Sequence, residues 1–422
     1  MPGEVNLTVR THKPSLPATG QPQLAYVLID AMPTDVLASV QMPLNFALVL
    51  DHSGSMAGAK LNSMKMAAKM AVDQMGSNDL VSIVVYDETA AVVVPTQLAT
   101  DRAELYRRID DIRDMGGTAM STGMGLGLDE LRKNHGPTRA SRMVLLTDGQ
   151  TFGDEADCQR LAGEAGQSGI AITAFGLGED WNQKLLEDIA RSSGGLSDFI
   201  DDATPHKIVD EFKRSVVSAQ AAVVQNTNLI MRLVTGVVSR NVWQVVPHIS
   251  KLGHRALSDR DVQVFLGDLV KGQGRSVLIE MEAPGRPAGR YRVAQVELDY
   301  DVPLANLAHE KARVDVLIGF TSDPAEAAQT DADVMNIIEK VTTFKLQTRA
   351  LEEAQAGNIA GATQKLRAAA TRLLEMGETD LAAEMQQEAL NLEQKGQMSS
   401  KGTKKITYAT RKLTQKLDDS TP

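Results

Sequence analysis

The sequence contains a single cysteine, Cys158, among its 422 residues, so no disulfide can form within the chain. This fits a reducing compartment. No apolar run approaches the roughly 20 residues that cross a bilayer, which predicts no membrane span. The N-terminus lacks the charged and then apolar pattern of a secretory signal. We therefore expect a cytoplasmic protein.

An excess of positive charge is also absent, because the formal net charge is -10. This argues against a general nucleic-acid binder or a binder of anionic membranes. Aromatic residues make up only 4% of the chain, so Leu, Val, Ile, Met and Ala must fill the cores. The seven histidines have no zinc-type spacing. The length indicates two or three domains of ordinary globular composition.

Residues 41–218 alternate short apolar strands with amphipathic helices. The segment NFALVL is apolar on both faces, as is typical of a strand buried in a parallel sheet. Strands alternating with helices predict a doubly wound α/β domain of the Rossmann-like type. Ligands bind at the carboxyl ends of the strands in such sheets.

Residues 219–322 change to a period of two with glycine-rich turns, which predicts a β-sandwich. Residues 1–40 carry similar strand patterns but are too few to form a stable sheet alone. We therefore expect them to join the sandwich, so that the α/β domain is inserted into the β domain. Residues 328–396 are alanine-rich and predict a helical hairpin or bundle. Residues 397–422 are basic and polar, and we expect a flexible tail.

Asp51, Ser53 and Ser55 form a D-x-S-x-S motif directly after the NFALVL strand. A turn of this form gathers one carboxylate and two hydroxyls, which are the oxygen ligands that hard cations such as Mg²⁺ prefer. The alternative is a helix N-cap, since aspartate and serine are common there.

Two further stretches favour the metal site. Thr118 lies in a glycine-rich loop before a predicted helix, and Asp148 ends the predicted strand of LLTDGQ. The glycines superficially suggest phosphate binding, but the sequence lacks G-K-[ST], so we do not expect a nucleotide site. His52 lies inside the first motif, and we interpret it as a variable position. Cys158 is expected to be a buried structural thiol because no activating partner is evident.

Together these motifs resemble the von Willebrand factor type A (VWA) domain, in particular the intracellular prokaryotic kind. That family's metal-ion-dependent adhesion site (MIDAS) uses D-x-S-x-S, a threonine in a second loop and an aspartate in a third. The resemblance covers about residues 44–217 and implies a divalent-cation site. Its implied ligands are Asp51, Ser53, Ser55, Thr118 and Asp148. It implies Mg²⁺, or else Mn²⁺ or Ca²⁺, with an Asp or Glu of a partner protein completing the site.

Three functions follow as hypotheses. The first is a metal-dependent protein interaction module without enzymatic activity. The second is an accessory subunit of a separate ATPase of the MoxR-like or chelatase-like kind, since the chain has no ATPase motif of its own. The third is a metal-dependent hydrolase, which needs a general base near the cation, and only His52 offers one.

Overall fold

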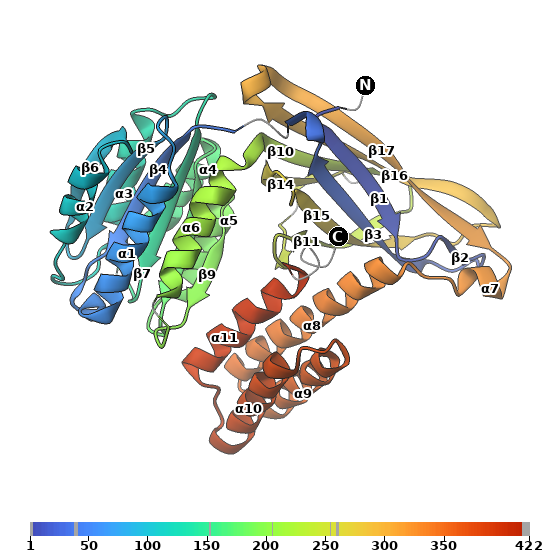
Figure 1. Cartoon of the computed structure of the whole chain (residues 1–422). Coiled ribbons are helices and arrows are strands. Elements are labelled where there is room, and N and C mark those ends of the chain that lie inside the picture. The colour runs from blue at the N-terminus through green and yellow to red at the C-terminus, as the bar shows by residue number, and fades with distance from the viewer. Residues whose placement is uncertain are drawn as a thin grey trace. The chain divides into compact units, whose positions relative to one another are not determined.

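The structure is a computed structural model that describes residues 3–37, 41–151, 153–204, 206–253, 255–258 and 261–415. By its internal contacts the chain forms two compact units (Figure 1). One unit comprises Ser39–Gln225 with Val302–Leu307. The other contains the N-terminal strands, the later strands and the C-terminal helices.

The first unit is built on a six-stranded sheet of order β6-β5-β4-β7-β8-β9. Its strands are β4 (Leu44–Asp51), β5 (Leu80–Tyr86), β6 (Ala90–Leu98), β7 (Ala140–Thr147), β8 (Ala171–Leu177) and β9 (Ser197–Ile200). All neighbouring pairs are parallel except β5 and β6. Every residue of β4 and β7 is buried, which explains the unbroken apolar runs Phe46–Leu50 and Met143–Leu146 at their centres.

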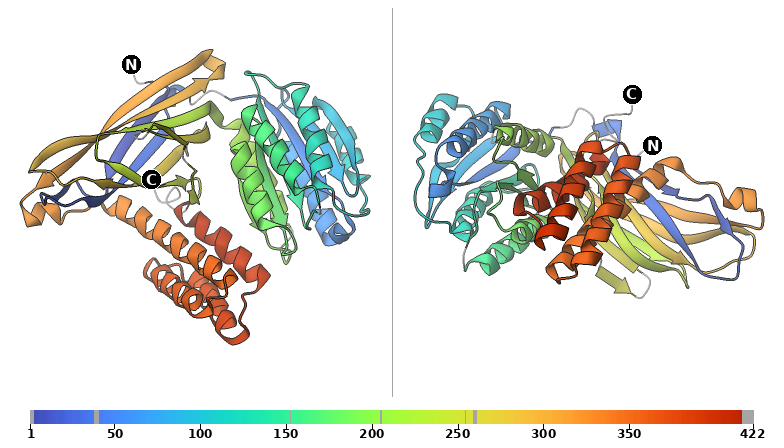
Figure 2. Two further views of the ribbon diagram at one scale, coloured as in Figure 1. Left: turned by 180° about the vertical axis from the view of Figure 1, so that it is seen from behind. Right: turned by 90° about the horizontal axis from the view of Figure 1, so that it is seen from below.

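Helices cover both faces of this sheet (Figures 1 and 2). The helices are α1 (Ala59–Gln74), α2 (Arg102–Asp110), α3 (Met120–Arg132), α4 (Glu155–Gln167), α5 (Gln183–Ser193) and α6 (Lys207–Gln220). Helix α1 packs against α2 and α6, whereas α4 packs against α3 and α5. Phe46 and Leu48 of β4 share a core with α1 and α6.

The second unit contains a β-sandwich. One sheet has the order β1-β3-β15-β11-β12, and the other β13-β14-β10-β16-β17-β2. The strands are β1 (Val5–Thr11), β2 (Ser15–Pro17), β3 (Gln23–Pro33), β10 (Ala222–Leu233), β11 (Val238–Val246), β12 (Ser250–Lys251), β13 (Arg255–Ser258), β14 (Asp261–Val270), β15 (Arg275–Ala283), β16 (Gly289–Val302) and β17 (Leu307–Thr321).

The N-terminal strands belong to this sandwich. Strand β3 lies between β1 and β15 and pairs antiparallel with both. Leu28 of β3 is opposite Leu278 of β15, although 250 positions separate them in the chain. The chain leaves the sandwich after β3, forms the α/β unit, and returns with β10. The predicted fold class, an α/β domain inserted in a β-sandwich and followed by helices, is confirmed.

The C-terminal region forms four helices, α8 (Ala332–Gln355), α9 (Ile359–Glu375), α10 (Thr379–Lys395) and α11 (Ser400–Arg411). A short helix, α7 (Pro324–Ala327), precedes them, and 3-10 turns occur at Asp35–Leu37, Gly54–Met56 and Pro303–Ala305. Asp331, Asn358 and Ser399 cap α8, α9 and α11 through side-chain oxygens. None of the helices in the described ranges is long and apolar enough to cross a membrane.

Helix α11 differs from the flexible tail that we expected for residues 397–422. It packs against α8 and α10, and its Ile406 and Tyr408 are buried. The lysines of this segment conceal a short apolar pattern, because Lys405 is exposed while the helix buries Ile406 and Tyr408, and even Lys404 is only 6% exposed. Residues 416–422 lie outside the described residues.

Candidate metal centre

The candidate site forms where β4 and β7 end. These strands are adjacent and parallel, with Leu50 opposite Leu146, so Asp51 and Asp148 leave the sheet at the same edge. Ser55 lies on the short 3-10 turn Gly54–Met56 that follows β4. The loop that carries Thr118 joins this turn through the backbone, because Gly54 N donates to the Gly116 carbonyl at 3.2 Å.

The five predicted residues come together. The Ser53 and Ser55 hydroxyl oxygens are 3.1 Å apart, and Ser55 Oγ donates to Asp148 Oδ1 at 2.6 Å. The Ser53 backbone N–H donates to Asp51 Oδ1 at 2.9 Å. A methyl group placed on Gly149 would lie 3.9 Å from Thr118 Oγ1 and 4.0 Å from Ser55 Oγ. Oxygen atoms from three loops that are distant in sequence therefore lie close together.

The two carboxylates and Ser53 are buried, whereas Ser55 and Thr118 form the open side. Asp51 is fully buried, and the Asp148 side chain is also 0% exposed. Ser55 is exposed and Thr118 is half-buried. Burial raises the pKa of Asp51, and hydrogen bonds from Ser53 and Thr147 oppose this shift. A ligand from solvent would reach the Ser55 and Thr118 oxygens first.

The oxygen donors fit a hard divalent cation. Two carboxylates and three hydroxyls are the donor types that Mg²⁺, Mn²⁺ and Ca²⁺ accept, and none of the five is a nitrogen or sulfur ligand. No group of three or more His, Cys, Asp and Glu side chains suited to a metal occurs within the described part of the chain. Hydroxyls are therefore essential members of this donor set.

Sequence reasoning missed Thr147 and Lys60. Thr147 Oγ1 donates to Asp51 Oδ2 at 2.8 Å, since the two residues are neighbours on adjacent strands. The Lys60 ammonium contacts Asp148 Oδ2 at 2.6 Å. The sequence did contain a signal for Thr147, because this threonine directly precedes Asp148 in the T-D-G triplet of LLTDGQ. Nothing in the spacing of Lys60 indicated its partner.

Two further residues tie the second loop to the third. Thr151 Oγ1 donates to the Thr118 carbonyl at 3.3 Å. Asp154 Oδ2 accepts the Ser121 backbone N–H, at 2.7 Å, in the first turn of α3. The loop that carries Thr118 is thus held by the loop that begins with Asp148, and a shift of one loop will displace the other.

His52 bonds to backbone instead of facing the oxygen cluster. Its Nδ1 lies 2.7 Å from the Arg113 carbonyl, which assigns the proton to Nδ1, and the residue is 7% exposed. This bond links the first loop to the segment before Thr118. Cys158 is buried, and burial raises the pKa of its thiol.

Gly123 and Gly127, which follow Thr118, are in helix α3 and serve packing. A methyl group on Gly123 would lie 2.7 Å from the Tyr86 ring, and one on Gly127 would lie 2.5 Å from a Val49 methyl. These distances are too short for a side chain, so the glycines allow α3 to approach the sheet closely. Tyr86 in turn donates from its hydroxyl to the Leu146 carbonyl at 2.9 Å, directly below the site.

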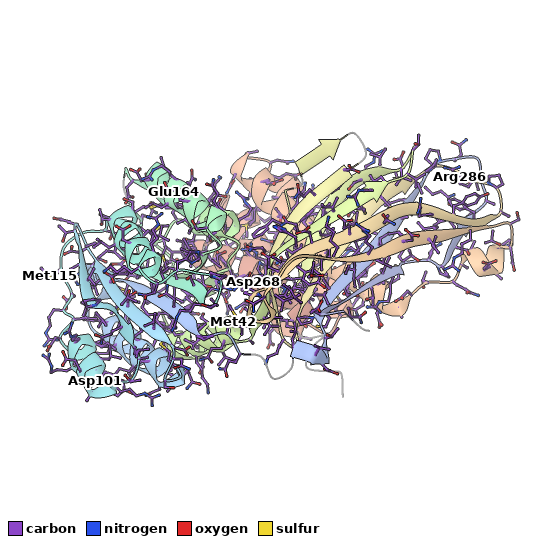
Figure 3. All side chains as sticks on the ribbon, turned by 90° about the horizontal axis from the view of Figure 1, so that it is seen from above. Met42, Asp101, Met115, Glu164, Asp268 and Arg286 are labelled. Carbon is purple, nitrogen blue, oxygen red and sulfur yellow. The ribbon has the colours of Figure 1, made fainter. Side chains whose placement is uncertain are left out.

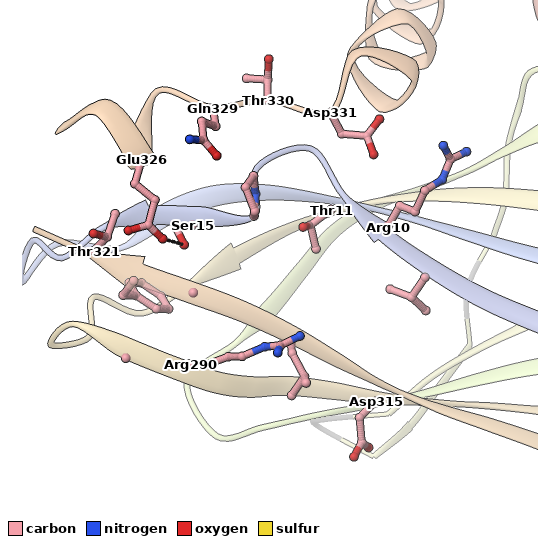
Figure 4. A pocket seen from close by; sticks show the side chains of 16 residues that line it. Arg10, Thr11, Ser15, Arg290, Asp315, Thr321, Glu326, Gln329, Thr330 and Asp331 are labelled. Carbon is pink, nitrogen blue, oxygen red and sulfur yellow. Dashed lines mark hydrogen bonds between the residues drawn. The ribbon is translucent and has the colours of Figure 1, made fainter. Parts of the chain in front are cut away.

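A second hollow, of about 750 Å³, lies in the sandwich unit and is lined by β1, β17 and α7 (Figure 4). Most of its charged groups, although not Arg290, bind other groups of the chain in the described contacts. Arg10 pairs with Asp333 at 3.0 Å, and Glu326 accepts from Ser15 at 2.6 Å. Asp315 is 3.5 Å from Arg292. These residues therefore do not direct a group of free hydrogen-bond donors into the hollow.

The doubly wound sheet and its loop cluster define a VWA domain, and the VWA family matches residues 45–211. A second family, the Sll0103-like C-terminal α-helical domain, matches residues 332–416. The uncharacterized protein sll0103 of Synechocystis sp. is 30% identical over 381 residues, which cover 89% of each chain. The chain therefore belongs to the Sll0103-like family of VWA proteins. The predicted resemblance to the VWA domain is confirmed.

Two solved structures share the fold over nearly the whole chain. The von Willebrand factor type A protein from Catenulispora acidiphila has a TM-score of 0.76 at 20% identity and covers 96% of both chains. The ArnB paralog VWA2 from Sulfolobus acidocaldarius has a TM-score of 0.55 at 16% identity and covers 97% of this chain and 98% of its own. VWA domains are a family of metal-dependent protein interaction modules.

Proposed function

We propose that this protein is a metal-dependent interaction module that binds an acidic side chain of a partner protein through a divalent cation. The cation would be held by Asp51, Ser53, Ser55, Thr118 and Asp148. The observation that carries this proposal is the convergence of their oxygens from three loops, with Ser55 Oγ 2.6 Å from Asp148 Oδ1 and 3.1 Å from Ser53 Oγ.

The charge of the site explains the choice of an acidic ligand. The protein supplies two carboxylates, and the other donors are neutral hydroxyls. The two carboxylates would balance the charge of a bound Mg²⁺ without exceeding it, so its exchangeable coordination position would still accept an incoming carboxylate oxygen. Because Asp51 and Asp148 are shielded from water, attraction between charges at this site exceeds that in bulk solvent.

The arrangement supports binding and gives no support to hydrolysis. A hydrolase needs a general base within reach of a bound water. His52 was the candidate. Its Nδ1 donates to the Arg113 carbonyl, which leaves Nε2 as the basic nitrogen, but the residue is only 7% exposed and so offers little access to a bound water. We infer that the protein is not an enzyme.

The rim of the site offers an apolar contact to the partner. Met115, labelled in Figure 3, is 58% exposed and forms a backbone bridge with Ser53. An acidic residue next to an apolar one would match this rim. A separate ATPase remains the alternative identity for the partner, and the cytoplasmic location remains a prediction.

The test is capture of the partner from a lysate of the native host, followed by affinity measurement with the purified partner. We expect the partner to bind in Mg²⁺ and not in chelator. Thr118→Ala should bind it about tenfold more weakly, because one charge-assisted contact is lost. Thr122→Ala is the matched control, since this exposed threonine bonds only to the Ala119 carbonyl.

Replacing one Asp or Glu of the partner by its amide should abolish binding. If the partner binds equally well in chelator and to the Thr118→Ala variant, recognition occurs elsewhere on the chain and the proposal is wrong.

A further inference from the structure

Lys60 carries a positive charge directly into the candidate metal site. Its ammonium lies 2.6 Å from Asp148 Oδ2, and its side chain is 25% exposed while that of Asp148 is 0% exposed. The same carboxylate receives the Ser55 hydroxyl on its other oxygen. Lys60 thus occupies one of the two oxygens that Asp148 offers.

The position of Lys60 is unfavourable for the helix that bears it. It is the second residue of α1, whose first turn contains no acidic residue. The exposed N–H groups at a helix N-terminus repel a cation. The contact with Asp148 compensates for this repulsion, so the placement of Lys60 is explained by the site and not by helix stability.

The other carboxylate oxygens of the site accept from neutral donors. Asp51 Oδ1 accepts the Ser53 backbone N–H, and Asp51 Oδ2 accepts from Thr147. The ammonium of Lys60 is therefore the charged donor in the described contacts of the two aspartates. A divalent cation at the same oxygens would experience its repulsion at short range.

We propose that Lys60 is a built-in competitor of the divalent cation and keeps the affinity of the site for the cation alone low. This inference rests on the proposed metal site. When the cation enters, the ammonium must give up Asp148 Oδ2, and it is then available to the second oxygen of a carboxylate bound at the cation. Cation and acidic ligand consequently favour each other's binding, and Lys60 is the residue that couples them.

The experiment is calorimetric titration of the full chain with Mn²⁺ alone. The variants are Lys60→Met, Lys60→Gln and Lys60→Arg, with Lys69→Met as the matched control. Lys69 lies on the same helix but pairs with the surface residue Asp110. Fluorescence of buried Trp181, which lies in the same unit, verifies that each variant is folded.

We expect Lys60→Met and Lys60→Gln to bind Mn²⁺ about tenfold more tightly than the wild type, because one repulsion is removed. Lys60→Arg and Lys69→Met should bind as the wild type does. Binding by Lys60→Met where the wild type binds none would also support the inference.

Equal or weaker binding by both Lys60→Met and Lys60→Gln would overturn the inference and leave the metal site standing. If neither the wild type nor any variant binds millimolar Mn²⁺, the proposed metal site is wrong and the role of Lys60 is refuted with it.

Discussion

Replacing Thr147 by valine should weaken the site without reshaping the core. Valine has nearly the volume and the branched shape of threonine, so it leaves no cavity in β7. What it removes is the hydroxyl that donates to Asp51 Oδ2 at 2.8 Å. Because Asp51 is fully buried, no solvent molecule can replace that donor.

The expected magnitude follows from this burial. A hydrogen bond to a charged group contributes about 1.5–3 kcal/mol, and a buried acceptor left without it bears the full desolvation cost. The same hydroxyl also lies 3.1 Å from the Gly149 carbonyl, and this longer contact contributes less to the free energy of unfolding. We expect Thr147→Val to lower the free energy of unfolding of the α/β unit by about 2 kcal/mol, or its melting temperature by roughly 4–8 °C.

The assay uses the two tryptophans of the chain, one in each unit. In a Trp243→Phe background, the fluorescence of Trp181 reports urea unfolding of the α/β unit alone. Thr147→Ser retains the hydroxyl and should restore most of the stability. Thr173→Val, at a half-buried position of β8, is the matched control and should leave stability within about 0.5 kcal/mol.

Mn²⁺ affinity should fall with Thr147→Val and recover with Thr147→Ser, because Asp51 loses and regains its orientation. If Thr147→Val changes neither stability nor Mn²⁺ affinity, Thr147 does not position Asp51 and our account of the site is wrong in this respect.

Two predictions concern the sandwich unit. Hydrogen bonds and charge from Arg232, then from Arg313 and Lys311, lower the pKa of Glu297 to about 2 from its usual 4.5. A carboxylate with a lowered folded-state pKa stabilises the fold above about pH 4.5, and this contribution is lost as the pH falls toward 2. Since the three cationic side chains are 44–56% exposed, we expect the free energy of unfolding to fall by only about 1–2 kcal/mol over this pH range. Urea unfolding between pH 5 and pH 2.5 measures this loss, which should be absent in Glu297→Gln. Deleting residues 1–34 removes β1 and β3, so the unfolding transition reported by Trp243 fluorescence should be lost while the one reported by Trp181 remains. Loss of both transitions would contradict the insertion of an independent α/β domain in the sandwich.

Much of the site could be predicted because each aspartate follows directly after a strand that the local sequence reveals. The apolar run before Asp51 indicates a strand buried on both faces, and LLTDGQ gives the same indication for Asp148. Parallel neighbours end at one edge, so the two aspartates meet without any knowledge of side-chain geometry.

The supporting contacts could not be predicted in the same way. Lys60 reaches Asp148 through a long flexible side chain, and its sequence spacing of 88 positions carries no signal. Thr147 reads as an ordinary β-branched strand residue until its partner on β4 is known. The close packing of Gly123 and Gly127 could not be predicted, because the side chains that they approach, Tyr86 and Val49, lie on strands earlier in the chain.

Helix α11 was missed for a different reason. Its composition is dominated by lysine and threonine, which is typical of a solvated segment. Tertiary packing against α8 and α10 outweighs this composition, because Ile406 joins the apolar core of the helices and Thr407 and Thr410 are buried beside it. Sequence patterns that rely on a few apolar residues are easily hidden by charge.

The central claim is that the five oxygens bind a divalent cation, and the most direct measurement is anomalous scattering from crystals soaked in Mn²⁺. We predict one strong peak in the α/β unit, in contact with the hydroxyl oxygens of Ser53, Ser55 and Thr118, which disappears in crystals of Asp148→Ala. A peak at another position, or no peak at millimolar Mn²⁺, would contradict the account.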